Sequence, residues 1–223
     1  VVNMLSRGRA LWSHLESCIF PDHCVGCGIE GHIICISCKK NIPDRGMFFH
    51  TPDTPLHSLI TLGLYAPNDI LTSIIQDIKY GYVEGSISIL EESLTTLFTH
   101  FSDAIARVDS IVPIPLHKKR YAARGVNQAH TIAKVVAKSS RKPMMLPLVR
   151  IRNTKQQVLL QKEERKTNII NAFSVVPDSC IFGKHILLVD DVYTTGATMN
   201  ECAKVLSAAG AQSVSGFVLA KGG

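Results

Sequence analysis

The sequence predicts an α/β domain whose mostly parallel sheet is flanked by helices, preceded by a small zinc-binding module. Strand-like and helix-like stretches alternate from residue 58 onward, and residues 184–190 (KHILLVD) contain an apolar run typical of a strand buried on both faces. Two CxxC pairs between Cys24 and Cys38 predict the module. We place the boundary near residue 50, with an N-terminal helix and zinc knuckle over residues 1–50 and the α/β domain over residues 51–223.

Composition excludes several classes of protein. The 223-residue chain is 46% hydrophobic and 19% charged, which excludes general disorder. No apolar run approaches the roughly 18 residues of a membrane span, so we expect no membrane insertion. The N-terminus has no long apolar stretch or small-residue cleavage site, so we expect no signal peptide and a cytoplasmic protein. The net charge of +6 favours anionic partners such as phosphates or nucleic acids, although many other soluble proteins share this balance.

Four cysteines suggest a metal site. Cys24 and Cys27 form one CxxC pair and Cys35 and Cys38 another, with seven residues between the pairs. Each CxxC turn can direct two thiolates at one tetrahedral ion, and zinc prefers four sulfur ligands without oxidising them. We therefore predict a structural Zn²⁺ site, with four unligated thiols or one redox CxxC as the alternatives. The odd total of seven cysteines argues against a disulfide framework.

Periodicity predicts the remaining elements. Before the cysteines, Met4, Leu5, Leu11, Trp12 and Leu15 approximate one face of a helix, and residues 43–55 are rich in Pro, Asp and Thr, as a linker would be. In the α/β domain we expect strands over residues 58–65, 109–115, 146–152, 184–190 and 213–219. Helical spacing predicts helices over residues 69–79, 84–101, 126–139 and 197–209.

The sharpest functional pattern follows the strand over residues 184–190. Two acids, Asp190 and Asp191, precede a turn and a helix start that contain Thr194, Thr195, Gly196, Ala197 and Thr198. A phosphate at a helix N-terminus gains backbone N–H donors, and glycine lets the backbone approach closely. The acids are placed to accept from sugar hydroxyls, so the pattern predicts a ribose 5-phosphate site at the carboxyl end of a strand. An acidic strand end before a threonine-capped helix, with no ligand, is the alternative.

Two basic segments could serve the same site or a nucleic acid. The first is one loop and helix start carrying Lys118, Lys119, Arg120 and Arg124. This cluster suits pyrophosphate or a nucleic-acid backbone equally well, with a solvated basic turn as the alternative. The second, residues 150–166, holds six cations against two acids, together with several amides. It is interpreted either as a strand-tracking or lid loop or as plain exposed surface.

Several motifs resemble known families. The stretch VDDVYTTGAT (residues 189–198) resembles the phosphoribosyl pyrophosphate motif of type I phosphoribosyltransferases. Residues 74–82 (IIQDIKYGY), 112–134 (VPIPLHKKRYAARGVNQAHTIAK) and 150–173 (RIRNTKQQVLLQKEERKTNIINAF) resemble the bacterial ComF/GntX competence family, as does a four-cysteine knuckle ahead of such a domain. The resemblance runs from about Cys24 to Lys221 and implies a type I phosphoribosyltransferase-like parallel sheet flanked by helices.

The resemblance also implies roles for individual residues. Asp190 and Asp191 would contact the ribose hydroxyls, and residues 194–198 would form the 5-phosphate loop. Residues 116–120 correspond to the pyrophosphate loop, and Mg²⁺ would accompany phosphoribosyl pyrophosphate. Residues 153–166 occupy the position of a mobile loop, for which the candidate residues are Arg152, Thr154, Gln157 and Arg165.

The family is linked to natural transformation. The resemblance therefore implies a competence protein that handles imported single-stranded DNA, with a competence helicase or recombination mediator as a candidate partner. An active phosphoribosyltransferase in nucleotide or base salvage, or a phosphosugar-sensing scaffold, are the alternatives. The phosphate loop is complete, but no base-specific hood is recognisable. Aromatic residues make up 6% of the chain, which limits base stacking and favours backbone contacts with DNA.

Overall fold

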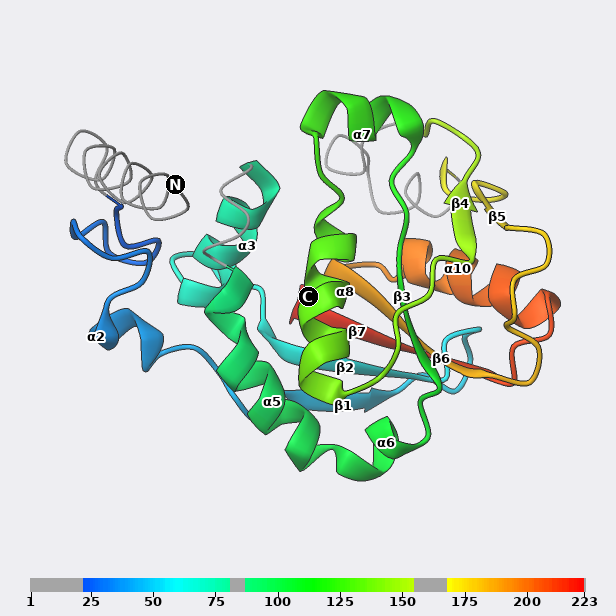
Figure 1. Ribbon diagram of the computed structural model, residues 1–223, viewed down its shortest axis with the longest axis horizontal. Helices are drawn as coiled ribbons and strands as arrows, with labels where there is room; N and C mark the ends of the chain where they lie inside the picture. Colours follow the sequence, from blue (N-terminus) through cyan, green and yellow to red (C-terminus); the bar gives the residue numbers. More distant parts are fainter. Residues whose placement is uncertain (1–21, 81–86, 155–167, 223) are drawn as a thin grey trace, which may run out of the picture.

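The protein is represented by a computed structural model that describes residues 22–80, 87–154 and 168–222 (Figure 1). The predicted helix around Met4 to Leu15 lies outside the described residues. The strands are β1 (Met47–His50), β2 (Ser58–Leu64), β3 (Ser110–Pro113), β4 (Leu148–Arg150), β5 (Phe173–Val175), β6 (His185–Tyr193) and β7 (Ser213–Lys221). The helices are α2 (Ile36–Lys39), α3 (Ile70–Tyr80), α5 (Leu90–His100), α6 (Ser102–Ala106), α7 (Lys118–Arg124), α8 (Gln128–Ser140) and α10 (Ala197–Ala208).

The main sheet has five strands in the order β1-β2-β7-β6-β3. The pairs β2–β7, β7–β6 and β6–β3 are parallel, and β1 is antiparallel at one edge. Strand β6 lies inside the sheet, with Leu188 opposite Val112 on one side and Gly216 on the other. Residues 186–189 are buried because helices cover both faces, which explains their continuous apolar character. The predicted α/β class with a mostly parallel sheet is confirmed.

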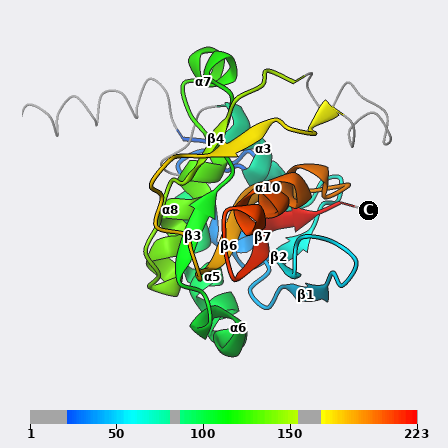
Figure 2. The same ribbon diagram turned by 90° about the vertical axis from the view of Figure 1, so that its right-hand side faces the viewer.

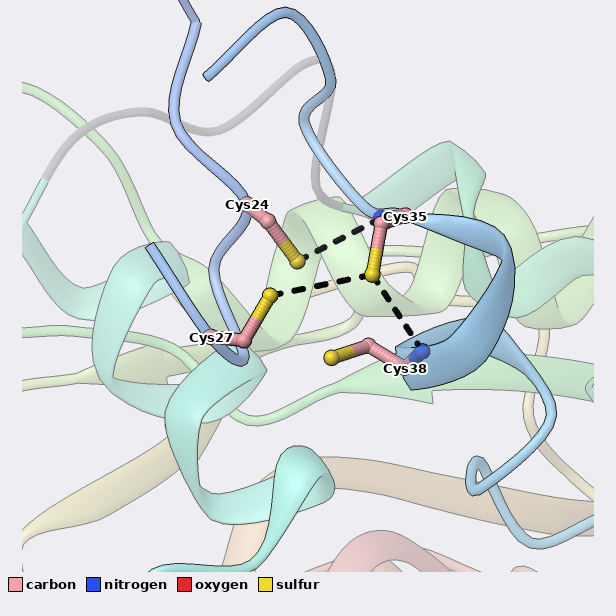
Figure 3. A group of neighbouring side chains, drawn as sticks. All are labelled: Cys24, Cys27, Cys35 and Cys38. Atoms are coloured by element: carbon pink, nitrogen blue, oxygen red, sulfur yellow. Dashed lines mark hydrogen bonds between the residues drawn. The ribbon is translucent and has the colours of Figure 1, made fainter. Parts of the chain in front are cut away.

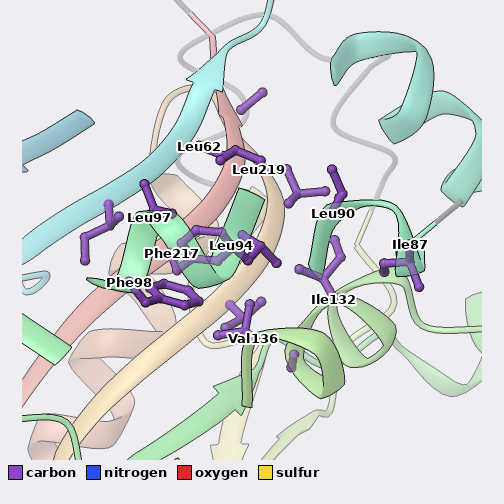
Figure 4. Packing of buried hydrophobic residues seen from close by; sticks show 14 of the residues in the cluster. Leu62, Ile87, Leu90, Leu94, Leu97, Phe98, Ile132, Val136, Phe217 and Leu219 are labelled. Carbon is purple, nitrogen blue, oxygen red and sulfur yellow. The ribbon is translucent and has the colours of Figure 1, made fainter. Parts of the chain in front are cut away.

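Two apolar clusters hold the layers together. Helices α3, α5 and α8 pack on one face of the sheet, where Leu94 and Leu97 of α5 meet Ile132 of α8 and Phe217 of β7 (Figure 4). Helix α10 packs on the opposite face, and Figure 2 shows α8 and α10 on either side of β6. Alternate residues of the strands supply the two clusters, since Leu187 belongs to the first and Leu188 to the second. Within the described ranges, no helix is long and apolar enough to cross a membrane.

The structure differs from the sequence prediction in several segments. Met47–His50, expected to lie in a linker, form edge strand β1, because Phe48 packs against the core and its ring lies 6.0 Å from that of Phe101. The strand predicted over residues 146–152 is shorter and outside the main sheet, where β4 pairs with an unpredicted strand, β5. The basic segment after residue 117, expected to be a loop and the start of the following helix, forms a separate short helix, α7. The division near residue 50 stays a prediction.

The four-cysteine region lies against the α/β domain rather than apart from it (Figure 1). Val25, Ile34 and Cys38 pack against the apolar cluster that contains helix α3. A Cβ added to Gly26 would lie 2.6 Å from Ile70 Cδ1 and 2.8 Å from Cys38 Sγ, so the turn between the first two cysteines is in close contact with α3. An exposed ion pair, Lys39 Nζ to Glu92 Oε2 at 2.8 Å, joins α2 to α5.

Candidate functional site

The predicted phosphate loop connects β6 to α10. Strand β6 extends through both acids to Tyr193, and Gly196 occupies the N-cap of α10 with φ of 73°. A Cβ at Gly196 would lie 2.1 Å from Tyr193 Oη, so both the left-handed backbone and the packing require glycine there. Residues 190–199 surround a hollow of about 90 Å³, which we call the loop cleft. The first N–H groups of a helix lack intrahelical partners, so this hollow is suited to an anion.

The two acids lie where this hollow meets a second cleft. The neighbouring space, of about 180 Å³, is called the acid cleft and is lined by Lys79, Ile114, Pro115, Leu116, Arg120, Arg124, Asn127, Gln128, Ala129, Arg150, Asp190, Asp191 and Thr198. Asp190, Asp191 and Thr198 belong to both clefts. Burial, and then repulsion from Asp191, raises the pKa of Asp190 to about 8, although Lys79 and Arg150 oppose the shift. A ligand that donates hydrogen bonds to Asp190 and Asp191 would therefore stabilise their negative charge.

Lys79 is a cation that sequence reasoning did not assign to the site. It lies near the end of α3, and its Nζ is 3.3 Å from Asp191 Oδ2, with both side chains mostly buried. A lysine near a helix end is usually solvated, so periodicity gave no reason to place Lys79 in the site. Its position inside the motif at residues 74–82 was the only sequence signal for such a role. The ion pair joins α3 to the strand that carries the acids.

Three arginines give the acid cleft its positive wall. Arg120 and Arg124 come from α7 and Arg150 from β4. Arg120 Nη2 donates to the carbonyl of Thr154 at 2.5 Å, and Arg150 Nη2 donates to the Thr154 hydroxyl. Burial, and then the charge of Arg120, lowers the pKa of Arg150 to about 10, so the group remains protonated at neutral pH.

Two further donors in this cleft are buried without a hydrogen-bond partner among the described residues. They are Arg150 Nε and Gln128 Nε2. Both residues line the acid cleft, and Gln128 is only 4% exposed. Buried polar atoms in folded proteins are nearly always satisfied, so unpaired donors in an arginine-lined cleft point to an anionic ligand.

The predicted basic cluster is divided by helix α7. Arg120 and Arg124 line the acid cleft, Lys118 lines a different cleft, and Lys119 is exposed and lines neither. Residues four apart share a helix face, whereas Lys118 and Lys119 point in other directions.

The mobile-loop candidates are placed only in part. Thr154 is 7% exposed and contacts both Arg120 and Arg150. Arg152 is exposed, and its Nη1 donates to the carbonyl of Ile170. Gln157 and Arg165 lie outside the described residues.

The four predicted metal ligands come together near the start of α3, at the end of the helix opposite to Lys79. The Sγ atoms of Cys24, Cys27, Cys35 and Cys38 all lie within 4.8 Å of one another (Figure 3). The separation of Cys27 and Cys35 Sγ is 3.7 Å, close to the roughly 3.8 Å between ligands of a tetrahedron with 2.3 Å metal–sulfur bonds. Burial opposes ionisation of Cys24, but N–H groups of Cys35, Cys27 and Gly26 lower its pKa to about 6. The cluster could therefore hold a structural metal ion.

Comparison with known proteins agrees with this architecture. The family described as "Phosphoribosyl transferase domain" matches residues 122–223. Competence protein ComFC of Bacillus subtilis is 32% identical over 158 residues, covering 70% of this chain and 62% of ComFC. DNA utilization protein YhgH of Escherichia coli is 29% identical over 204 residues, covering 89% of this chain and 83% of YhgH.

Among solved structures, adenine phosphoribosyl transferase from Trypanosoma brucei is 13% identical, with a TM-score of 0.42 over 80% of this chain and 87% of that one. This chain spans less than two thirds of ComFC and most of YhgH. The relatives are named competence and DNA utilization proteins, and the matched transferase domain follows a four-cysteine cluster, so the resemblance to the ComF/GntX competence family is confirmed.

Proposed function

We propose that this protein acts in the cytoplasm during natural transformation, where it handles imported single-stranded DNA, and that its transferase-type domain binds phosphoribosyl pyrophosphate or a related phosphosugar. One observation carries the phosphosugar part. The loop cleft and the acid cleft share Asp190 and Asp191 in their walls, so a helix N-terminus, two acids and three arginines line two adjoining hollows.

Each part of the ligand has a matching group. The 5-phosphate would lie in the loop cleft against the start of α10, where backbone N–H groups and the threonine hydroxyls donate. The ribose hydroxyls would donate to Asp190 and Asp191. The pyrophosphate would face Arg120, Arg124 and Arg150, with the buried donors of Arg150 and Gln128 among its partners.

The residues present also fit the two metal ions expected from the sequence, Mg²⁺ and Zn²⁺. Asp190 and Asp191 are the carboxylates lining the acid cleft, and carboxylate and phosphate oxygens are the ligands that Mg²⁺ prefers. When bound with the phosphosugar, Mg²⁺ would neutralise part of the pyrophosphate charge. The four-sulfur cluster suits Zn²⁺, which would have a structural role because four thiolates leave no open position.

The DNA part of the proposal rests on the relatives and on charge. The curated relatives are named for competence and DNA utilization, and this chain carries a net charge of +6. A cationic surface binds the backbone of single-stranded DNA and releases its condensed counterions. A competence helicase or recombination mediator would be the protein that delivers or receives the strand.

Isothermal titration with phosphoribosyl pyrophosphate and Mg²⁺ tests the phosphosugar site. We expect saturable binding that Asp191→Asn weakens. Asp103→Asn changes an exposed residue of α6, at the opposite end of the sheet from α7, and as the matched control it should bind as the parent does (Figure 1). Absence of binding by the parent protein would refute the proposed site. Pyrophosphate release on adding a nucleobase would show that the protein is an active transferase instead of a binding protein alone.

A further inference from the structure

A larger cleft lies beside the acid cleft and is not used by the phosphosugar. Its volume is about 640 Å³, within the range of roughly 300–1,000 Å³ that is usual for ligand pockets. It is lined by Pro113, Pro115, Leu116, Lys118, Tyr121, Ala122, Val126, Asn127, His130, Thr131, Lys134, Leu146 and Leu148, and we call it the tyrosine cleft. It shares Pro115, Leu116 and Asn127 with the acid cleft, so the two are neighbours divided by uncharged residues.

Helix α7 separates the two clefts through its own periodicity. Arg120 and Arg124, four residues apart, face the acid cleft. Lys118, Tyr121 and Ala122, at spacings of three and four, face the tyrosine cleft. A cluster that appears as one basic run in the sequence therefore supplies two different sites.

The lining of the tyrosine cleft indicates the chemistry of its ligand. Apolar side chains such as Val126 and Leu148 form part of its wall, and Tyr121 is 54% exposed. Lys118 and Lys134 are exposed cations at the cleft, and among its described lining residues there is no carboxylate. Burial, and then the charge of Lys134, lowers the pKa of His130, so its imidazole is neutral at physiological pH and can accept or donate a hydrogen bond.

We propose that the tyrosine cleft binds a nucleotide of single-stranded DNA, with a base stacked on Tyr121 and the adjoining phosphates near Lys118 and Lys134. An apolar wall with one exposed aromatic ring suits an unpaired base, and flanking lysines suit the anionic backbone on either side of it. The proposal rests on the proposed DNA-handling function and adds to it a location apart from Asp190 and Asp191. The phosphosugar and the DNA strand then occupy separate clefts on the two faces of α7.

Fluorescence anisotropy with a labelled oligodeoxythymidine of about 15 nucleotides tests the proposal. Tyr121→Leu keeps an apolar, helix-forming side chain but removes the ring, and should weaken DNA binding about tenfold, whereas Tyr121→Phe should retain it. The double variant Lys118→Gln with Lys134→Gln should reduce the slope of log affinity against log salt by about 1.4. Lys138→Gln is the control for loss of a lysine outside the cleft, because Lys138 lies on α8 with Lys134 but pairs with Glu91 and lines neither cleft.

A reciprocal measurement separates the two clefts. Arg120→Gln with Arg124→Gln should weaken binding of phosphoribosyl pyrophosphate, while Tyr121→Leu should leave it unchanged. If the parent protein binds DNA and Tyr121→Leu binds it equally well, the tyrosine cleft is not the DNA site and this inference fails alone. If the parent protein binds no DNA, the DNA-handling function fails as well. Sedimentation showing a dimer that Tyr121→Leu dissociates, with DNA affinity unchanged, would assign the cleft to a second copy and overturn the inference.

Discussion

Asp190 holds its proton close to neutral pH because its strand is buried between two layers of helices. Its pKa of about 8 lies above the ordinary value of 3.8, so the native state retains a proton that the unfolded chain has lost. The free energy of unfolding should therefore fall as pH rises between about 4 and about 8. Asp190→Asn removes this contribution and should gain stability relative to the parent across the same window. Urea unfolding at a series of pH values measures the difference, and a difference independent of pH would contradict the assignment.

Lys79 should act as a positioning residue for the acid pair. Its ammonium pairs with Asp191 and lowers the pKa of Asp190, so removing the charge leaves the mostly buried acid pair with less compensation for its negative charge. We expect Lys79→Met to weaken phosphosugar binding by about tenfold or more and to shift the pH dependence of that binding to higher pH. Lys79→Arg should retain most of the affinity. Isothermal titration across pH distinguishes the two variants. Equal phosphosugar affinities of Lys79→Met and Lys79→Arg across pH would show that the charge has no role.

At the scale of elements, the turn from β6 to α10 depends on one glycine. Gly196 and Gly183 both have a positive φ, of 73° and 69°, but a Cβ at Gly183 would meet nothing within 4 Å. Alanine at either position should therefore cost about 1 kcal/mol of stability through the left-handed conformation. Gly196→Ala should in addition displace Tyr193 and weaken phosphosugar binding, which Gly183→Ala should leave intact. Denaturant unfolding and titration of both variants test this, and equal ligand affinities would contradict it.

At the scale of the whole molecule, the cysteine cluster and the acid cleft lie at the two ends of α3. Gly26 contacts Ile70 near the start of this helix, and Lys79 reaches Asp191 from its other end. If the four cysteines hold a metal ion, removing it should therefore lower the melting temperature and also weaken phosphosugar binding, because metal binding would supply folding energy to the module that packs on α3. Cys24→Ser should show both effects. Cys180→Ser, which changes an exposed cysteine outside the cluster, should show neither.

Those measurements require elemental analysis and thermal melting of each variant, together with titration. A Cys24→Ser protein that lacks the metal but binds the phosphosugar with parental affinity would show that the knuckle and the cleft are independent. Failure of the parent protein to hold about one zinc per chain when fully reduced would remove the metal site itself.

The distribution of charge over the molecule determines how DNA binding should respond to salt. If three to five phosphates are contacted, log affinity against log salt should have a slope of roughly −2 to −3.5. Sequence preference should be slight, because backbone contacts carry no base information and stacking on Tyr121 is tolerant of base type. Gel shifts over a salt series with oligodeoxythymidine and a mixed sequence test both points. A slope near zero would exclude a backbone-dominated interface.

The features that depend on local patterns were predictable from the sequence alone. Two CxxC pairs are enough to predict a cluster because each turn brings its two thiols together, and the Sγ atoms of the four cysteines do lie within 4.8 Å. The run over residues 186–189 predicts a strand buried on both faces, because helices must cover such a strand. The acids and the turn at residues 190–198 are contiguous, so their shared cleft also follows from chain connectivity.

Contacts between distant segments were decided only by the tertiary structure. Lys79 and Asp191 are separated by more than 100 residues, and no local pattern distinguishes a lysine that reaches a carboxylate from one that is solvated. Arg150 joins the site because β4 pairs with β5 outside the main sheet, and β1 forms because Phe48 finds the core beside Phe101. The division of the basic cluster into two clefts likewise needed the orientation of α7 against α8 and β4, since helical periodicity separates the faces but only packing decides what each one meets.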